Sequence, residues 1–361
     1  MRLLHLINYE KQSYAIINMI LECSCDENYF IVLNFNSNSN NYKKSNSKNV
    51  VYTEKDYLKK EYKKLLEADF VICHSLNFGP ILIFQLFKNN RLRKNIVPIF
   101  WGADIYDWFK VRRSIKGKLN FFLVETLRKQ MFSNICAFCT LARGDYNQFC
   151  KTYGDKIKNF FLFYKPDISL SELSSLKQKK QYEKKTKVLV GHQANPFNKH
   201  LEALKSLDKF KTNIEVYCPL SYGGNKNYVN SVIEQGEKIF GENFHPVLEM
   251  MPSNKYLEFL NDMDIIILPS LRQIGTLNII TSLLLKKKVY LSKDGMVFNH
   301  YKEMLDIEFY PYEDIPSLNF DDFVENKNKE KNYEKTKFFI SNEGVYTYWK
   351  PLFDYLRSDI K

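Results

Sequence analysis

The chain has 361 residues, and its 53 lysines and arginines exceed its 41 aspartates and glutamates to give a net charge of +12. One hydrophobic core rarely serves so many residues, so we expect two domains. The charge favours anionic partners, namely nucleic acid, a phospholipid surface or phosphorylated small molecules. The lysine- and asparagine-rich residues 36–49 are equally typical of a solvated loop, so charge alone does not choose among these partners.

Hydrophobic runs are short. No run approaches the ~20 consecutive apolar residues that cross a bilayer, and residues 1–8 are typical of a buried strand rather than of a signal peptide. We therefore expect a cytoplasmic location. The seven cysteines lack the spacing of a disulfide framework, which indicates reduced thiols. Cys136 and Cys139 form a Cys-x-x-Cys pair, but "ICAFCT" is typical of a buried strand and no second pair completes a zinc site.

Strand-like and helix-like segments alternate from the first residue. Such alternation predicts a parallel sheet with helices on both faces, here over residues 1–168. The expected strands are 2–8, 29–35, 50–53, 69–75, 95–102 and 135–140, with helices around 15–21 and 54–67, an apolar segment at 79–89 and a long helical region that ends near 131.

Residues 169–187 are polar and basic and are predicted to be a linker, after which the alternation restarts. A second doubly wound domain is expected over 188–330, so that two Rossmann-like domains face a cleft at the carboxyl ends of their strands. Residues 331–361 form an aromatic-rich helical tail, expected to pack across the domain boundary or to cap the second domain. The second set of expected strands is 187–192, 213–219, 244–249, 264–270 and 288–292.

Five segments between residues 95 and 300 carry a family resemblance. They are "FWGADIYD", "ARGDYNQFCKTYGD", "VLVGHQANPFNKHLEAL", "PLSYGGNKNYVNSVIEQGEKIFGEN" and "RQIGTLNIITSLLLKKKVYLS". They resemble the 4-acetamido-4,6-dideoxygalactosyltransferases, glycosyltransferase family 56. The resemblance implies the two-domain GT-B architecture and transfer of N-acetylfucosamine from a thymidine diphosphate (TDP) sugar to a lipid-linked saccharide of enterobacterial common antigen.

A glycine follows a hydrophobic strand and precedes a helix in "RQIGTLN". The first turn of a helix has free N–H groups and a positive dipole end, so this position suits a phosphate. Gly275 allows close approach, and Arg272 adds charge for a leaving diphosphate. The alternative is a helix that needs a small residue only for packing. The donor-binding candidates of this segment are Arg272, Gln273, Gly275, Thr276 and Asn278.

Two further loops of the second domain offer donor contacts. Asn198 is a candidate ligand or, equally, the N-cap of a helix that begins at Lys199. Tyr222 offers an aromatic face for a base or a sugar, whereas turn chemistry alone explains the glycines beside it. The candidates are Gly191, His192, Asn195 and Asn198 in the first loop, and Pro219, Tyr222, Gly223 and Gly224 in the second.

Asp262 and Asp264 have the Asp-x-Asp spacing with which many glycosyltransferases hold manganese. They precede their strand, at the end of the sheet opposite the expected cleft, and are more typical of a solvated strand start. We therefore expect a metal-independent enzyme without a cofactor.

Three residues that follow first-domain strands are candidates for the general base. A transferase needs a group that takes the proton of the acceptor hydroxyl. Glu10 and Asp104 are equally placed, and His74 follows them. Asp104 has the alternative role of helix cap, and a lone histidine is more often a hydrogen-bonded structural residue.

Basic residues precede an apolar helix at 110–132. This combination suits an anionic membrane that carries a lipid-linked acceptor, at the cytoplasmic face of the inner membrane. A core helix after a solvated basic loop is the alternative. No nucleic-acid module accompanies the charge, so no nucleic-acid partner is expected. The cations are Arg112, Arg113, Lys116 and Lys118.

Several functions compete with this prediction. A glycosyltransferase with another nucleotide sugar would serve capsule, lipooligosaccharide or flagellin glycosylation. A nucleotide-sugar 2-epimerase shares the architecture. A sugar-phosphate binding protein without catalysis is the non-enzyme alternative.

Overall fold

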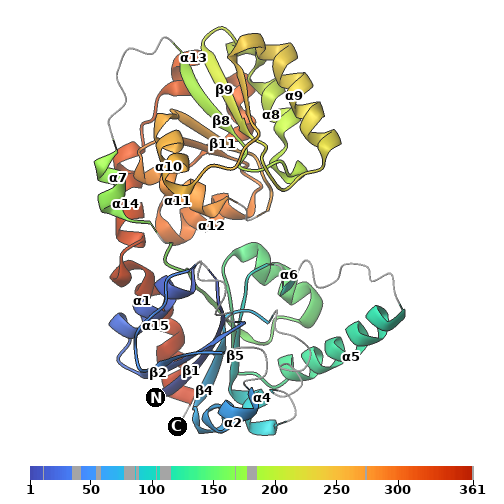
Figure 1. The fold of residues 1–361 in the computed structure, drawn as a ribbon, viewed down its shortest axis with the longest axis vertical. Coiled ribbons are helices and arrows are strands. Elements are labelled where there is room, and N and C mark those ends of the chain that lie inside the picture. Colours follow the sequence, from blue (N-terminus) through green and yellow to red (C-terminus); the bar gives the residue numbers. More distant parts are fainter. Residues whose placement is uncertain are drawn as a thin grey trace. The chain divides into compact units, whose positions relative to one another are not determined.

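The computed structural model describes residues 1–10, 12–34, 42–53, 58–76, 86, 89–102, 104–105, 115–166, 168–176, 185–272 and 275–359. The chain divides into two compact units, of which the first comprises residues 1–167 with 340–361 and the second comprises residues 168–339. Each unit has a parallel sheet with helices on both faces (Figure 1). The predicted α/β class is confirmed.

The first unit is built on a parallel sheet whose described strands follow the order β3-β2-β1-β4-β5-β6-β7. The central strands have continuous apolar runs because helices cover both faces, as in most parallel sheets. Five consecutive residues of β1, from Leu3 to Ile7, are buried. The strands are β1 (Arg2–Asn8), β2 (Glu27–Leu33), β3 (Val50–Tyr52), β4 (Phe70–Cys73), β5 (Ile96–Phe100), β6 (Ala137–Thr140) and β7 (Lys158–Phe161).

Helices form two layers on this sheet. One core cluster joins one face of the sheet to α2, α4, α5 and α6, and the other cluster joins the opposite face to α1 and α15. The helices are α1 (Ser13–Cys23), α2 (Leu58–Glu67), α4 (Asn90–Asn95), α5 (Ile115–Phe132), α6 (Arg143–Tyr153) and α15 (Asn342–Asp359).

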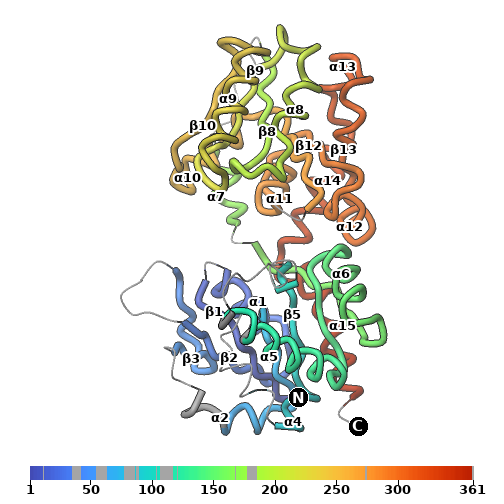
Figure 2. The backbone as a smooth tube through the Cα atoms, turned by 90° about the vertical axis from the view of Figure 1, so that its right-hand side faces the viewer, coloured from blue at the N-terminus to red at the C-terminus, as the bar shows by residue number. Residues whose placement is uncertain are grey.

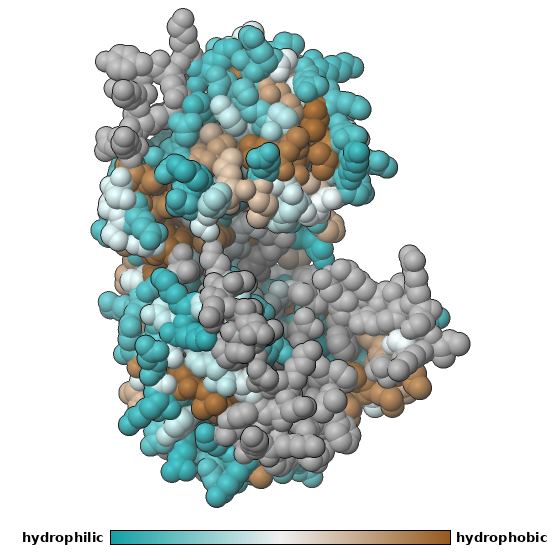
Figure 3. Space-filling model, viewed as in Figure 1, coloured by the Kyte–Doolittle hydropathy of each residue, from teal (hydrophilic) through white to brown (hydrophobic). Residues whose placement is uncertain are grey.

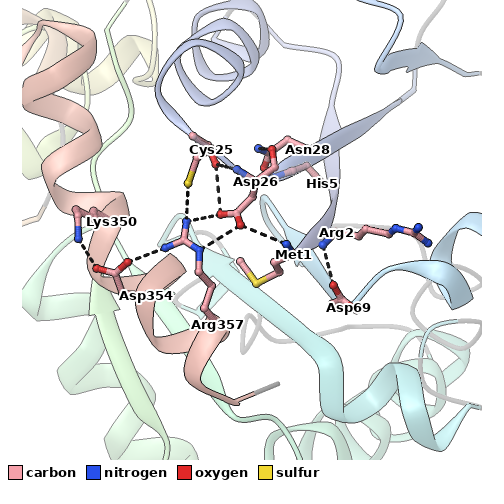
Figure 4. Close-up of polar contacts among 11 residues, drawn as sticks. Met1, Arg2, His5, Cys25, Asp26, Asn28, Asp69, Lys350, Asp354 and Arg357 are labelled. Atoms are coloured by element: carbon pink, nitrogen blue, oxygen red, sulfur yellow. Dashed lines mark hydrogen bonds and ion pairs between the residues drawn. The ribbon is translucent and has the colours of Figure 1, made fainter. Parts of the chain in front are cut away.

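The last helix, α15, returns to the first unit and completes its core, and both chain termini lie there (Figure 2). Trp349 is fully buried, and its indole N–H donates to the Phe163 carbonyl at 2.8 Å. At the other end of the helix, Arg357 forms an ion pair with the buried Asp26 at 2.6 Å (Figure 4). Helix α15 therefore packs on one face of the first sheet.

The second unit repeats this architecture with the described strand order β10-β9-β8-β11-β12-β13. In both units the first strand lies centrally and the order reverses beside it, which is the arrangement of dinucleotide-binding folds. Ligands bind such sheets at the carboxyl ends beside this reversal, between β1 and β4 or between β8 and β11. The strands are β8 (Thr186–Val190), β9 (Ile214–Pro219), β10 (Phe244–Val247), β11 (Ile265–Leu268), β12 (Lys288–Leu291) and β13 (Tyr310–Pro311).

Helices cover both faces of the second sheet as well. The core cluster of one face takes in α8, α9 and α13, while α11 packs with α10 and α14 elsewhere in the unit. The helices are α7 (Leu170–Ser175), α8 (His200–Ser206), α9 (Lys226–Phe240), α10 (Ser253–Asp262), α11 (Thr276–Leu284), α12 (Met296–Leu305), α13 (Phe320–Val324) and α14 (Lys329–Phe339), with short 3-10 turns at Pro196–Asn198, Asp208–Phe210, Gly241–Asn243 and Tyr312–Ser317.

Candidate active site

A pocket of about 270 Å³ lies in the first unit, where β1, β4 and β5 end. This is the point of strand reversal, so the pocket occupies the position at which such sheets bind ligands. All three predicted base candidates line it, although they are far apart in the sequence. The described lining residues are Ile7, Asn8, Glu10, Gln12, Ser13, Ile16, His74, Ser75, Trp101 and Asp104.

The Asp104 carboxylate is buried and hydrogen-bonded. One oxygen accepts from the Ser75 hydroxyl at 3.0 Å, and the other accepts from the Leu76 N–H at 3.2 Å. The Arg128 guanidinium donates to the Asp104 main-chain carbonyl at 3.0 Å. Burial nevertheless raises the pKa of Asp104, against the opposing effect of these hydrogen bonds. These contacts hold the side chain against the loop after β4.

The Glu10 side chain lies at the rim of the same pocket and is exposed. Its carboxylate makes no hydrogen bond or ion pair with the part of the chain that the structure describes, whereas its main-chain N–H donates to the Ser13 hydroxyl at 2.9 Å. Partial desolvation raises the pKa of Glu10, and the nearby charge of Asp104 raises it further. Glu10 is therefore a carboxylate whose oxygens are available to a ligand.

His74 is held by hydrogen bonds on both ring nitrogens. The Asn28 amide donates to the Asp26 carbonyl at 2.8 Å, so its oxygen accepts from His5 Nε2 at 3.0 Å. His5 Nδ1 then accepts from His74 Nε2 at 3.0 Å, and His74 Nδ1 accepts from the Tyr164 hydroxyl at 2.9 Å. Burial lowers the pKa of His5 to about 4 and that of His74 well below its ordinary value. His74 is a neutral structural residue in this arrangement.

Ser75 and Trp101 are among the pocket residues that the sequence reasoning missed. Ser75 has φ of 115°, a left-handed backbone conformation that is costly for a residue other than glycine and that often marks functional sites. Trp101 lies within the family-like "FWGADIYD" segment and contributes to the pocket wall. The available signal was position, because both residues follow the last residues of a strand.

In the second unit, the loops after β8 and β11 meet at the corresponding strand reversal. Gly275 is the N-cap of α11 with φ of 71°, and a Cβ added there would lie 3.1 Å from His192 Nδ1. Glycine is therefore needed here both for its conformation and for its size. The Thr276 hydroxyl hydrogen-bonds Tyr301, and the Asn278 amide donates to the Tyr256 hydroxyl at 2.8 Å.

Both polar atoms of the Asn198 amide are hydrogen-bonded within the loop after β8. Its amide oxygen lies 3.0 Å from His192 Nδ1, and its amide nitrogen donates to the Gln193 carbonyl at 2.9 Å. The helix α8 has Lys199 as its N-cap, so the alternative role predicted for Asn198 was wrong. Asn198 instead orients His192, whose Nδ1 donates to the Asn198 oxygen and whose Nε2 is therefore a hydrogen-bond acceptor. Asn195 caps the short turn at Pro196–Asn198 by accepting from the Phe197 N–H at 3.0 Å.

The glycines after β9 make a close contact with the loop after β8. A Cβ at Gly223 would lie 2.9 Å from the Gln193 side chain, and one at Gly224 would lie 1.9 Å from the Ala194 carbonyl oxygen. Packing therefore explains these glycines. Tyr222 is 47% exposed, and Pro219 is the last residue of β9. Gly191 has φ of 75° and packs on His200.

Arg272 stacks on the ring of Phe197, with its guanidinium carbon 4.4 Å from the ring centroid. This contact joins the loop after β11 to the loop after β8. The neighbouring candidate Gln273 lies outside the described residues. The site in the second unit thus combines a helix N-terminus, a guanidinium and an oriented histidine.

Asp262 and Asp264 lie at the amino end of β11, where both interact with Lys187. The Lys187 ammonium contacts Asp262 at 2.7 Å, and its main-chain N–H donates to Asp264 at 2.9 Å. These carboxylates therefore anchor the start of a strand, at the opposite end of the sheet from the loops described above.

The first half of α5 exposes large apolar side chains. Leu119, Phe122 and Leu123 are 59%, 67% and 54% exposed, and Lys118 is exposed beside them. Figure 3 shows this apolar surface on α5. The alternative of a core helix holds for the face with Val124, Met131 and Phe132, which packs in the core of the first unit, whereas the side chains named above lie outside it. Arg112, Arg113 and the side chain of Lys116 lie outside the described residues.

No helix among the described residues combines the length and the apolar character that a membrane span requires.

Comparison with protein families identifies one match over most of the chain. The family described as "4-alpha-L-fucosyltransferase glycosyl transferase group 56" matches residues 18–308. The match includes the loops of the second unit and two of the three base candidates, His74 and Asp104, while Glu10 lies before it.

Solved structures with this fold cover nearly the whole chain. A glycosyltransferase from Rickettsia africae is 14% identical with a TM-score of 0.62, covering 100% of this chain and 98% of its own. Anabaena Alr3699/HepE in complex with UDP is 14% identical with a TM-score of 0.64, covering 99% and 100%. A trehalose-6-phosphate protein from E. coli bound with UDP-2-fluoro glucose is 10% identical with a TM-score of 0.61, covering 99% of each chain. These likenesses show the GT-B fold.

Proposed function

The chain belongs to glycosyltransferase group 56, and from this membership we propose that it transfers a 4-acetamido-4,6-dideoxyhexose from a TDP-sugar to a lipid-linked saccharide. The chain is a glycosyltransferase with the GT-B fold. Sugar, nucleotide and acceptor are the parts that we propose. The UDP and UDP-sugar in the related structures support a nucleotide diphosphate donor here as well.

The donor diphosphate is assigned to the N-terminus of α11. The first-turn N–H groups and the helix dipole favour an anion, and Gly275 keeps the approach open. Arg272 and His192 flank this end from the two adjoining loops. As the glycosidic bond breaks, negative charge develops on the leaving diphosphate, and the first-turn N–H groups and Arg272 stabilise it.

The acceptor hydroxyl is assigned to the pocket of the first unit, where Glu10 is the general base. Glu10 takes the hydroxyl proton as the acceptor oxygen attacks the anomeric carbon, and the bond from that carbon to the diphosphate breaks. Asp104 orients the same hydroxyl group through a carboxylate that Ser75 and Leu76 hold in place. The observation that carries this assignment is that Glu10 and Asp104, from separate loops, converge on one pocket at the strand reversal.

The exposed face of α5 is assigned to an anionic membrane that carries the acceptor lipid. Leu119 and the pair Phe122–Leu123 are three and four residues apart, so they lie on one side of the helix. Lys118 stands beside them, as expected for a helix that lies in the headgroup region. The net charge of +12 also favours binding to an anionic membrane.

Titration calorimetry with TDP, UDP, GDP and inorganic diphosphate tests the donor assignment. We expect TDP to bind most tightly, inorganic diphosphate to bind weakly and Arg272→Gln to reduce the affinity for every nucleotide by at least about tenfold, as loss of a charge-assisted hydrogen bond predicts. Tighter binding of GDP than of TDP would contradict the proposed donor. Unchanged affinities in Arg272→Gln would show that this loop does not bind the diphosphate.

A further inference from the structure

The Asn198 amide fixes which nitrogen of His192 carries a hydrogen. The Asn198 amide nitrogen donates to the main-chain carbonyls of Gln193 at 2.9 Å and Asn195 at 3.3 Å. The Asn198 amide oxygen is therefore the atom that lies 3.0 Å from His192 Nδ1, and because this oxygen only accepts, Nδ1 carries a hydrogen. A neutral imidazole has one N–H group, so Nε2 of a neutral His192 presents a lone pair.

The His192 ring lies against the N-cap of α11. Its Nδ1 and Cε1 atoms lie 3.1 and 3.5 Å from the position of a Cβ on Gly275. Nε2, which is bonded to Cε1, makes no hydrogen bond with the part of the chain that the structure describes. A phosphate oxygen that reached Nε2 of neutral His192 would meet a lone pair instead of a hydrogen, which is repulsive.

Burial keeps His192 neutral in the absence of an anion. Burial lowers the pKa of His192, and the hydrogen bond to Asn198 only partly opposes this effect. The titratable side chain beside it is His200 of α8, which is fully buried and whose pKa is lowered to about 4 by burial and then by the charge of His192. The charged side chain in the described part of the loop after β11 is Arg272, a permanent cation. Among the described residues, no carboxylate stabilises a charge on His192.

We propose that His192 binds the donor diphosphate as an imidazolium, so that donor binding takes up one proton from the solvent onto Nε2. The new N–H group donates to a diphosphate oxygen, while Nδ1 keeps its hydrogen bond to Asn198. The negative charge of the diphosphate favours the charged ring, as an opposite charge within a few ångströms does. This inference rests on the proposed function and makes donor binding at α11 dependent on pH. Donor affinity should decrease as the pH rises, because the proton that binding needs becomes scarcer.

Titration calorimetry with TDP at about pH 7.5 counts the protons that binding takes up. The observed enthalpy is measured in Pipes, Hepes and Tris, which have different enthalpies of ionisation, and its slope against the buffer enthalpy equals the number of protons. The terminal phosphate of TDP, with a pKa of about 6, is almost fully ionised under these conditions and contributes little to the count. We expect uptake of about one-half to one proton per TDP in the wild type and about none in His192→Gln.

The affinity for TDP gives a second readout. His192→Gln should bind TDP at least about tenfold more weakly, because it loses a charge-assisted hydrogen bond. From about pH 7 to pH 8.5 the wild-type affinity should fall by up to about tenfold per pH unit, the slope for one linked proton, whereas that of His192→Gln should change little.

His245→Gln is the matched control, because His245 is a partly exposed histidine of β10 in the same unit, where its ring stacks on Tyr217. It should leave the proton count and the affinity unchanged. TDP binding without proton uptake in the wild type, or equal uptake in His192→Gln and the wild type, would overturn the inference and leave the donor assignment intact. Absence of TDP binding would instead contradict the proposed donor, and the proton linkage with it.

Discussion

Glu10 and Asp104 share one pocket, but their surroundings assign them different roles. Both Asp104 oxygens accept hydrogen bonds from the loop after β4, which fixes the carboxylate and limits its use as a proton acceptor. The Glu10 oxygens meet no hydrogen-bond donor within the described residues, and the negative charge of Asp104 makes Glu10 more basic. A raised pKa strengthens a general base, provided that the base stays ionised at the working pH.

Glu10→Gln should lower kcat by about 10²–10⁴, because it removes the proton acceptor while keeping the size of the side chain. Donor affinity should stay within about twofold of wild type. Steady-state kinetics with saturating donor and acceptor, together with calorimetry, measure both quantities. Asp104→Asn is the comparison, since the Asn oxygen can accept from Leu76 and its amide can donate to Ser75, and it should lower kcat less. Near wild-type turnover in Glu10→Gln would exclude Glu10 as the base.

The pH profile separates these two carboxylates. The base acts ionised, so the rate should be full above the pKa of Glu10 and fall as the pH decreases through it. Desolvation and the charge of Asp104 both raise that pKa, so the acid limb should lie above the ordinary range of a glutamate. Asp104→Asn removes the negative charge beside Glu10, so the acid limb of the pH profile of kcat/KM should move to lower pH. A limb that stays in place or moves to higher pH would contradict this coupling.

At the scale of elements, the alternation of strands and helices was predictable because buried parallel strands have distinctive apolar runs. The loops after β1, β4, β8 and β11, where the candidate site residues lie, followed from the same pattern. The hydrogen bonds within those loops were not predictable from the sequence. Asn198 resembles a helix cap in the sequence, but the left-handed Lys199 supplies the N-cap and leaves the Asn198 amide to His192. Such pairings depend on three-dimensional packing that residue spacing does not encode.

Gly275→Ala should weaken donor binding at least about tenfold. The new Cβ would lie 3.1 Å from His192 Nδ1, so the histidine must shift by a few tenths of an ångström at the helix end that we propose for the diphosphate. Gly241→Ala is the matched control, because Gly241 also has positive φ, 54°, in the same unit, while its added Cβ would meet no atom within 4 Å. Backbone strain should cost Gly275→Ala about 1–2 kcal/mol of stability, because Gly275 is left-handed, and Gly241→Ala about 1–3 kcal/mol, because its φ of 54° and ψ of −125° are unfavourable for residues other than glycine. Equal donor affinities of Gly275→Ala and Gly241→Ala by calorimetry would show that the diphosphate does not bind at the N-terminus of α11.

The apolar half of α5 should govern membrane binding. Replacing Leu119, Phe122 and Leu123 together with Ser should reduce cosedimentation with anionic liposomes well over tenfold, because full burial of each such side chain contributes about 1.5–3 kcal/mol. Phe338→Ser on α14 is the control, since Phe338 is 52% exposed in the other unit. Equal sedimentation of the triple variant and the control at physiological salt would show that α5 is not the membrane contact.

At the scale of the whole molecule, the chain repeats one strand order in two units, and we propose a different part of the chemistry for each. The first unit carries carboxylates and an aromatic wall, which suit a sugar hydroxyl, and the second carries a helix N-terminus with Arg272, which suits a diphosphate. The repeated fold was predictable from the sequence. The pocket that Glu10, His74 and Asp104 share was only partly predictable. The sequence places each residue after a strand, but it does not show which side-chain oxygen or nitrogen already makes a hydrogen bond within the protein.

The central claim is tested most directly by product analysis. The purified chain is incubated with lipid-linked saccharides from membrane extract and with TDP-4-acetamido-4,6-dideoxygalactose, and the lipid fraction is analysed by mass spectrometry. We predict that the saccharide gains one 4-acetamido-4,6-dideoxyhexose residue, and that Glu10→Gln abolishes most of this gain. A saccharide that gains a sugar only from another nucleotide donor, or a TDP-sugar that is isomerised without any acceptor, would contradict the account.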